Sequence, residues 1–225
     1  MRAPLAIALF LLALPLHARE VDFDPHPGAR IPDVAFREGG LRDYLGTRPV
    51  VLVLGYEGCV NLCGTTLDGV SLALRDTGLS AGRDYTALFV SVDPRDEKAP
   101  REQRAGWHFL TGADSAAAVA KTVGFRYYYE EESGQFAHPA GFVVLTPQGD
   151  IARYFMGVRF DASQLRQAIA EAARGRTQGT FERVLLLCFH DPVSGKYTQS
   201  VLTGIRIAMI MLLAALGFVA WRKLR

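Results

Sequence analysis

The sequence lacks the features of a nucleic-acid-binding protein. Its 225 residues contain 25 Lys and Arg against 23 Asp and Glu, so there is no basic excess. Five of the 25 basic residues lie in the end segments 1–18 and 201–225, which contain no acidic residue. The part between the ends therefore has 20 basic and 23 acidic residues, a net charge of −3. This balance excludes the basic footprint that DNA or RNA binding requires.

Internal repeats and low-complexity tracts are also absent. The length is sufficient for one sizeable domain with accessory segments. The hydrophobic content of 49% is raised by apolar runs at both ends of the chain. Each of these runs has its own interpretation.

Residues 1–18 have the organisation of a secretory signal peptide. Arg2 precedes an apolar run over Ala3–Leu14, and the small residue Ala18 ends the segment. The run is short for a bilayer span, which favours a cleaved signal over an uncleaved anchor helix. We therefore predict export, with cleavage near Ala18. Leu16 is larger than cleavage sites prefer, so the sequence does not define the exact bond that is cleaved.

Residues 201–221 predict a transmembrane helix. The uncharged stretch Ile207–Trp221 reaches only about 22 Å at 1.5 Å per residue. Adding Val201–Arg206 extends it to about 31 Å, enough for the hydrocarbon core of a bilayer. The basic tail 222–225 then stays in the cytoplasm. A buried core helix is the alternative. Together, the two ends predict a single-pass protein of the inner membrane, with its domain on the periplasmic side.

Strands and helices alternate between the two ends. We expect an extended lead-in at 19–32 and a juxtamembrane extension at 177–200. Buried strands are expected at 49–54 and 86–92, a hairpin at 142–155, and helices at 65–74, 100–107, 115–123 and 161–174. This order predicts an α/β sheet covered on both faces. A strand that leads into cysteines at a helix start suggests a thioredoxin-like fold over residues 33–176.

Cysteine is scarce, and two of the three cysteines lie close together. Cys59 and Cys63 are four residues apart, between a strand and the start of a helix. This spacing places two side chains on one helix face, about 5–6 Å apart. A helix N-terminus favours the thiolate, which is both the nucleophile and the metal ligand. A purely structural disulfide remains the alternative, but it would close only a small loop and add little stability.

Two cysteines alone make an incomplete metal site, and His138 is the best candidate for a third ligand. It lies at the entrance of the predicted hairpin, and in a thioredoxin-like fold that loop faces the cysteine helix. A lone loop histidine is usually unremarkable, but this position brings His138 towards the cysteines. Two thiolates and one imidazole suit copper, and zinc with a water also fits. We expect His108 at a helix end and Met156 in the core.

Several motifs follow one another in a characteristic order: Cys59-Val60-Asn61-Leu62-Cys63, Ser91-Val92-Asp93-Pro94, Trp107 with Leu110-Thr111-Gly112, and His138 followed by Pro147-Gln148-Gly149. In this order, over roughly residues 30–175, the chain resembles the Sco/SenC family. These are thioredoxin-fold copper proteins of cytochrome c oxidase assembly.

The resemblance implies that Cys59, Cys63 and His138 bind one copper ion per domain, as Cu(I) or Cu(II). Asp93 is a candidate residue near the ligands. The implied function is to deliver copper to the binuclear copper site of cytochrome c oxidase subunit II, or to another acceptor, or to keep the cysteines of that site reduced. Further implied partners are periplasmic copper donors and thiol reductases, beside membrane lipid.

Two other functions use the same thiols. Cys59 and Cys63 would serve a thiol–disulfide oxidoreductase as its redox pair, without obligatory copper. A pure reductase, however, has little need of a histidine facing the pair. A thiol peroxidase is disfavoured, because such enzymes set the reactive cysteine beside an arginine and the cysteine loop has none.

The chain departs from the family pattern at two positions and extends beyond it at a third. Gly64 follows the second cysteine where the family has proline, and this frees the backbone at the helix start. Pro139 follows His138, which leads us to hypothesise a cis peptide bond there. Beyond the family core lie Cys188 and His190. They are either packed residues of a strand or juxtamembrane segment, or they provide a second copper contact or a resolving thiol for the Cys59/Cys63 pair.

Overall fold

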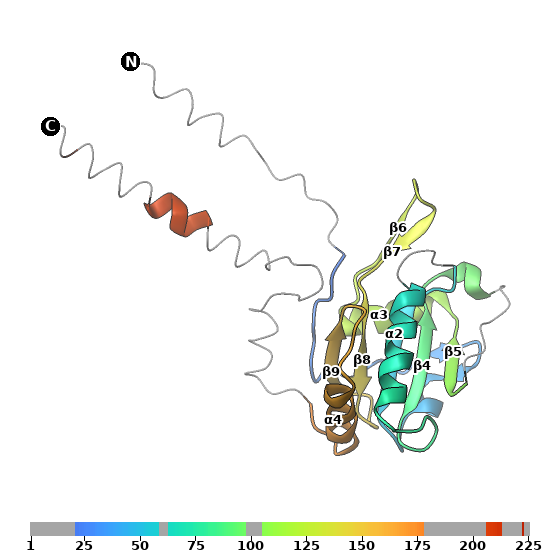
Figure 1. The fold of residues 1–225 in the computed structure, drawn as a ribbon. Coiled ribbons are helices and arrows are strands. Elements are labelled where there is room, and N and C mark those ends of the chain that lie inside the picture. The colour runs from blue at the N-terminus through green and yellow to red at the C-terminus, as the bar shows by residue number, and fades with distance from the viewer. Residues whose placement is uncertain (1–20, 59–62, 98–104, 178–205, 213–221, 223–225) are drawn as a thin grey trace.

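A five-stranded mixed sheet forms the centre of the protein (Figure 1). The computed structural model describes residues 21–58, 63–97, 105–177, 206–212 and 222. The strand order is β5–β4–β3–β8–β9, and the strands are β3 (Val50–Gly55), β4 (Thr86–Ser91), β5 (Trp107–Leu110), β8 (Gly141–Leu145) and β9 (Ile151–Met156). β3, β4 and β5 run parallel, whereas β8 is antiparallel to β3 and β9 is antiparallel to β8.

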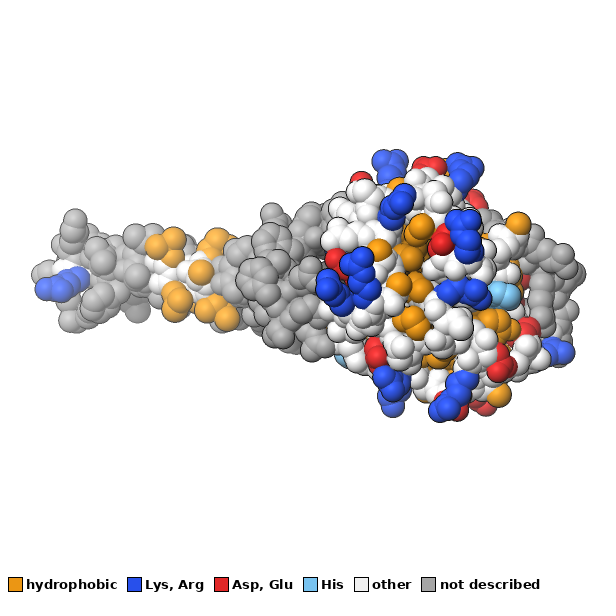
Figure 2. All heavy atoms as spheres, turned by 90° about the horizontal axis from the view of Figure 1, so that it is seen from below, with side chains coloured by type: hydrophobic (Ala, Val, Ile, Leu, Met, Phe, Trp, Pro, Cys, Tyr) orange, Lys and Arg blue, Asp and Glu red, His pale blue; other side chains and the backbone are white. Residues whose placement is uncertain are grey.

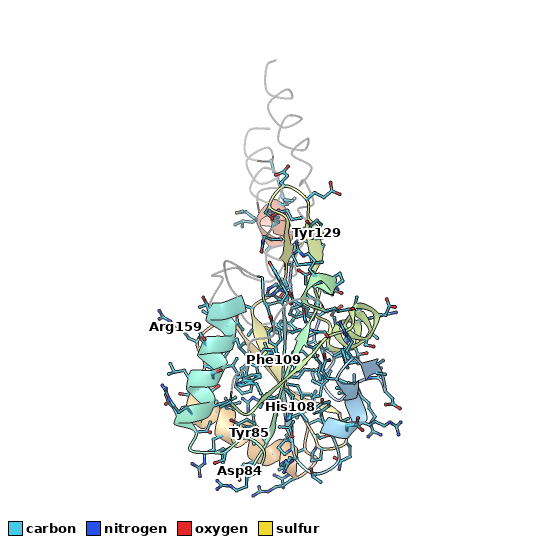
Figure 3. All side chains as sticks on the ribbon, turned by 90° about the vertical axis from the view of Figure 1, so that its right-hand side faces the viewer. Asp84, Tyr85, His108, Phe109, Tyr129 and Arg159 are labelled. Carbon is cyan, nitrogen blue, oxygen red and sulfur yellow. The ribbon has the colours of Figure 1, made fainter. Side chains whose placement is uncertain are left out.

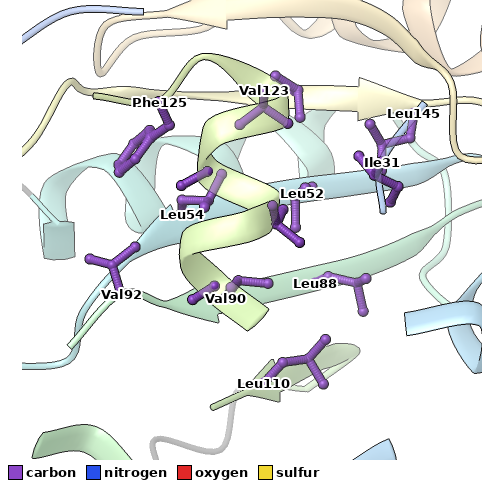
Figure 4. Packing of buried hydrophobic residues seen from close by; sticks show 14 of the residues in the cluster. Ile31, Leu52, Leu54, Leu88, Val90, Val92, Leu110, Val123, Phe125 and Leu145 are labelled. Atoms are coloured by element: carbon purple, nitrogen blue, oxygen red, sulfur yellow. The ribbon is translucent and has the colours of Figure 1, made fainter. Parts of the chain in front are cut away.

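Helices cover both faces of this sheet. On one face, α2 (Cys63–Asp76) and α4 (Ala162–Ala173) pack their Leu67 and Leu165 against Val51 and Val53 of the sheet. On the other face, α3 (Ala113–Val123) covers side chains that include Leu52 and Val90 (Figure 4). All six positions of β3 and of β4 are buried, as the continuous apolar runs predict for strands covered on both faces. The predicted α/β class is confirmed, and the arrangement is consistent with a thioredoxin-like fold.

The predicted end of the helix at 115–123 and the predicted start of the helix at 161–174 are confirmed in physical detail. The side chain of Asp161 accepts a hydrogen bond from Gln164 N and caps α4. Gly124 ends α3 in the left-handed conformation, with φ of 68°. A Cβ at this position would lie 1.7 Å from the carbonyl oxygen of Asp24, so only glycine fits.

One predicted element is wrong at its described end. The helix expected at 100–107 was to finish with Trp107 and His108, but Trp107 begins strand β5 and pairs with Ala87. Phe109 packs against Phe89 at a ring distance of 5.2 Å, so pairing with β4 decides the conformation here. His108 is thus a strand residue, and its ring lies 5.1 Å from that of Tyr44. Residues 98–104 lie outside the described part.

Several short elements were not predicted. They are β1 (Ala35–Phe36), β2 (Gly39–Gly40), two 3-10 turns η1 (Leu41–Tyr44) and η2 (Pro94–Glu97), and a hairpin of β6 (Tyr128–Glu130) and β7 (Gln135–Ala137). The β6–β7 hairpin projects from the body of the molecule (Figure 1).

The lead-in packs against the domain. Phe23 and Ile31 are buried in the same cluster as the α3 face of the sheet. Phe23 and Phe125 form a β-bridge, as do Arg30 and Asp150. The guanidinium of Arg30 grips the carboxylate of Asp150 with hydrogen bonds of 2.7 and 3.0 Å, which lowers the pKa of Asp150.

Both predicted membrane-targeting segments fall mainly outside the described residues. The signal peptide at 1–18 lies wholly outside them. Of the predicted span 201–221, residues 206–212 are described and are helical. Within the described part of the chain, no helix is both long enough and apolar enough to cross a membrane.

Candidate metal centre

Three segments that are distant in sequence meet at one edge of the sheet. The parallel strands β3 and β4 end at Gly55 and Ser91, and β8 begins at the same edge because it runs antiparallel to β3. This edge therefore gathers the segment that leads to the cysteines, the turn that contains Asp93, and the loop that contains His138. Ligand sites of open α/β sheets commonly occupy the carboxyl ends of the parallel strands.

The described part of the cysteine motif is its helical end. Helix α2 begins at Cys63, two residues before its predicted start, and no acidic residue lies in its first turn. The partial positive charge of a helix N-terminus stabilises a thiolate. Residues 59–62, which include Cys59, and the side chain of Cys63 lie outside the described part. Their predicted ligand role therefore stays a prediction.

His138 is held between two aromatic rings at this edge. Its ring lies 5.7 Å from that of Tyr56, nearly perpendicular to it, and 5.5 Å from that of Phe125, in a stacked arrangement. Tyr56 directly follows β3 and stands three residues before Cys59. The contact between Tyr56 and His138 thus brings the predicted histidine ligand next to the segment that leads into the cysteines.

The hydrogen bonding of His138 favours one tautomer. Its Nδ1 lies 2.9 Å from the carbonyl oxygen of Pro139. A carbonyl oxygen only accepts hydrogen bonds, so Nδ1 is the donor, and in the neutral ring Nε2 then carries the lone pair. A metal-bound histidine characteristically donates its other ring nitrogen to such an acceptor, which fixes the ring. This arrangement fits a copper or zinc ligand.

The hypothesis of a cis bond before Pro139 is wrong. No cis peptide bond occurs in the described residues, which include Pro139. The trans form is the intrinsically favoured one. With the trans bond, the Pro139 carbonyl accepts the hydrogen bond from His138 Nδ1.

Asp93 is buried beside the site but pairs with an arginine. Its side chain is 2% exposed and lies 2.6 Å from the NH2 group of Arg95. The Nε of Arg95 donates to both carboxylate oxygens, at 2.9 and 2.7 Å. This pairing raises the pKa of Arg95. Asp93 therefore lies in the predicted region, but its carboxylate is paired with Arg95 of the same turn.

Sequence reasoning missed Asp96, a second buried carboxylate of the same turn. Asp96 Oδ2 accepts hydrogen bonds from Glu57 N at 2.8 Å and from Ser91 Oγ at 2.6 Å. It thereby joins the turn after β4 to the segment before Cys59. The available signal was the position of Asp96, three residues after Asp93 in a turn that follows a buried strand.

Sequence reasoning also missed Tyr56, which is 2% exposed. Its hydroxyl donates to Gln135 Oε1 at 2.6 Å, and its ring also contacts Phe136 of the β6–β7 hairpin at 5.7 Å. The signal was an aromatic residue directly after the first buried strand. It links the cysteine segment, His138 and the hairpin.

The other candidate residues lie elsewhere or outside the described part. Met156 packs against the core, as predicted. Cys188 and His190 lie outside the described residues. Within the described residues, no three His, Cys, Asp or Glu side chains form a group that could hold a metal. The proposed donor set of Cys59, Cys63 and His138 therefore stays a prediction.

The opposite edge of the sheet carries different features. A shallow hollow of about 300 Å³ lies by the starts of β4 and β5 and is lined by Ser71, Leu74, Arg75, Ala81, Tyr85, Ala105 and Trp107. The end of the molecule opposite the hairpin shows Lys and Arg side chains around a small hydrophobic area (Figure 2). Neither feature adjoins His138, so the candidate site remains at the carboxyl edge of β3 and β4.

Comparison with known proteins assigns the family. The family model described as SCO1/SenC matches residues 41–174, more than half of the chain. The chain belongs to the SCO1/SenC family. A search of curated proteins finds no match.

Solved structures share the fold at low sequence identity. A SCO1/SenC family lipoprotein from Bacillus anthracis str. Ames matches with a TM-score of 0.54 and 18% identity, covering 65% of this chain and 97% of that one. ScoI of Arabidopsis thaliana, crystallised with copper bound, matches with a TM-score of 0.51 and 19% identity, covering 67% and 98%. A protein from Aquifex aeolicus VF5 gives a TM-score of 0.56 and 22% identity, covering 67% and 96%.

Proposed function

We propose that this protein is a membrane-anchored copper carrier of the periplasmic side of the inner membrane. It delivers copper to the binuclear copper site of cytochrome c oxidase subunit II, or keeps the cysteines of that site reduced. Family membership supports this proposal. The observation that carries it is the His138 ring, whose Nδ1–H is bound by the Pro139 carbonyl while the ring packs beside the segment that leads into the cysteines.

Each residue has a distinct task in copper transfer. Cys59 and Cys63 bind as thiolates and give up their protons when copper arrives. His138 contributes the lone pair of Nε2. Copper leaves by ligand exchange, as the ligands of the acceptor replace these three in turn and the thiols take up protons again. A tether to the membrane of the acceptor raises the effective concentration of this encounter.

The second function is thiol–disulfide exchange. The start of α2 at Cys63 favours it, because a helix N-terminus increases the thiolate fraction. One thiolate would attack a disulfide of the partner and release one partner thiolate. The second cysteine would then attack the mixed disulfide, so that the partner is reduced and Cys59 and Cys63 become a disulfide.

Copper binding by the full-length reduced protein tests the proposal. We expect one tightly held copper per chain, lost in Cys59→Ala, Cys63→Ala and His138→Ala and kept in Cys188→Ala. Failure of the wild type to hold copper, with a Cys59–Cys63 disulfide that forms and reduces readily, would establish the oxidoreductase instead.

A further inference from the structure

The carboxylate of Asp93 is the anchor of a hydrogen-bonded clamp. Both of its oxygens accept from Arg95, and Asp93 Oδ1 also accepts from the backbone N–H of Arg95 at 2.8 Å. Ser91 Oγ lies 3.1 Å from Asp93 N and fixes the backbone of the same turn. A buried carboxylate that meets an arginine side-on in this way holds the guanidinium plane in one orientation.

Arg95 extends from this anchor to the β6–β7 hairpin. Its NH1 group donates to the carbonyl oxygen of Gly134, in the hairpin turn, at 3.2 Å. The centre of its guanidinium lies 5.6 Å from the ring of Tyr129 and 5.9 Å from that of Phe136. One side chain therefore contacts the turn and both strands of the hairpin.

The hairpin is short, and its internal contacts do not fix its position relative to the sheet. Its two strands contain three residues each and pair in one register, Tyr128 with Ala137, Tyr129 with Phe136 and Glu130 with Gln135. An isolated two-stranded hairpin is only marginally stable in water. Tertiary anchors such as Arg95 and the Tyr56–Gln135 hydrogen bond must therefore set its position on the domain.

The hairpin leads directly into the candidate ligand. Strand β7 ends at Ala137, and His138 is the next residue. Phe136, which lies beneath Arg95, packs on Tyr56, and Tyr56 packs on the ring of His138. A change in the position of β7 would thus move the His138 backbone and the ring stack around it.

We propose that Arg95 is a positioning residue for His138, and that Asp93 acts on the metal site through Arg95 rather than by touching the metal. The inference rests on the proposed function for its copper readout, but its geometric part concerns the protein without copper. Arg95 holds the β6–β7 hairpin against the domain, and the hairpin holds the imidazole with Nδ1 towards the Pro139 carbonyl.

The first measurement is nitrogen NMR of the copper-free, full-length protein labelled only at histidine, with His138→Gln to assign the signals. In the wild type, His138 is expected to show a protonated Nδ1 and an unprotonated Nε2. In Arg95→Ala and Asp93→Asn, both signals should move towards the average of two exchanging tautomers. Arg95→Lys keeps the charge but not the planar fork, so it should fall between.

Arg83 offers a matched control. It pairs with the adjacent Asp84 through contacts of 2.9–3.2 Å. Figure 3 shows Asp84 at the other end of the molecule from Tyr129. Arg83→Ala removes the same kind of ion pair and should leave the His138 signals unchanged.

The second measurement is copper affinity of the same variants. Loss of a partner that orients a ligand typically weakens metal binding tenfold to a hundredfold, so we expect about that increase in Kd for Arg95→Ala, and no change for Arg83→Ala. The Cu(II) EPR spectrum should lose its imidazole-nitrogen coupling, while the thiolate-to-copper charge-transfer bands of the absorption spectrum persist. Unchanged His138 signals in both Arg95→Ala and Arg95→Lys would overturn the inference. A wild type without copper would refute the proposed function, while the NMR result still decides the positioning role.

Discussion

The carboxylate of Asp96 accepts a hydrogen bond from the backbone N–H of Glu57, 2.8 Å away, and so ties the turn after β4 to the segment that leads into Cys59. Asp96 is 5% exposed, and Ser91 Oγ supplies its second partner. A buried carboxylate with two donors holds those donors firmly, and its removal leaves them unsatisfied. This relationship leads to the first prediction.

Replacing Asp96 by alanine should destabilise the protein by about 1–3 kcal/mol, because Glu57 N–H and Ser91 Oγ both lose their acceptor. Ser91→Ala keeps the carboxylate and its bond to Glu57 but leaves Asp93 N–H without its Ser91 acceptor, so it should also cost about 1–3 kcal/mol. Urea unfolding measures both. The thiol pair should also react faster with an alkylating reagent in Asp96→Ala than in Ser91→Ala. Equal effects of the two variants on thiol reactivity would remove Asp96 from the support of the cysteine segment.

Replacing either of two glycines of helix α2 by alanine should change the stability of the protein, but in opposite directions. At Gly64, where the family has proline, a Cβ would meet nothing within 4 Å among the described atoms. At Gly69, a Cβ would lie 2.2 Å from the carbonyl oxygen of Val158. Neither glycine has a positive φ. Gly64→Ala should therefore stabilise the protein by about 0.5–1 kcal/mol through the entropy of the unfolded chain.

Gly69→Ala should instead destabilise the protein by about 1–3 kcal/mol, because the backbone after β9 must shift away from α2. Thermal unfolding of both variants and the wild type measures the pair. A stabilised Gly69→Ala protein would mean that α2 does not approach Val158 as closely as the structure has it.

Tyr154 should make stability depend on alkaline pH. Burial raises the pKa of its hydroxyl from the ordinary 10.0 to about 12. A raised pKa means that the folded state holds the proton more tightly than the unfolded state. The resulting contribution to the free energy of unfolding is complete below pH 10 and is lost as the pH rises towards 12. Two pKa units correspond to roughly 2–3 kcal/mol.

The Tyr154→Phe variant isolates that contribution. The hydroxyl donates to Val123 O at 3.0 Å and accepts from His26 N at 2.9 Å, so its loss should cost about 1–3 kcal/mol at neutral pH. Urea unfolding from about pH 7 to about pH 11 should show the difference between the two proteins shrinking above pH 10, while other tyrosines cancel. A constant difference across this range would mean that Tyr154 ionises as readily folded as unfolded.

The sequence predicts the elements whose signals are local and repeated. β3, β4 and the β8–β9 hairpin are recognisable because continuous apolar runs or a turn signal define them without knowledge of their neighbours. α3 and α4 are recognisable through Gly124 and Asp161. Strand β5 is not, because its four residues gain their conformation from hydrogen bonds to β4, which no local pattern reports.

The candidate site divides in the same way. His138 and Asp93 are found because motifs mark them. No motif marks the roles of Asp96, Arg95 and Tyr56, because each depends on a partner 39 to 79 residues away. Asp96 pairs with Glu57, Arg95 with Gly134 and Tyr56 with Gln135. A side chain that positions a ligand leaves no spacing signal, since its partner is brought to it only by the completed sheet.

Tyr56 allows the ring contact with His138 to be separated from the hydroxyl contact with the hairpin. Tyr56→Phe removes the 2.6 Å bond to Gln135 Oε1 but keeps the ring that faces His138 at 5.7 Å. We expect it to cost about 0.5–1.5 kcal/mol of stability. Copper binding should weaken much less than after loss of the ring, because Arg95 still holds the hairpin turn. Tyr56→Leu removes the ring as well while retaining an apolar side chain. It should weaken copper binding about tenfold, because the imidazole loses one of the two aromatic rings that flank it.

Copper affinity and urea unfolding, measured on both Tyr56 variants, distinguish the contribution of the ring from that of the hydroxyl. A copper loss as large in Tyr56→Phe as in Tyr56→Leu would assign the effect to the hydroxyl and the hairpin, and would show that the ring itself does not hold His138.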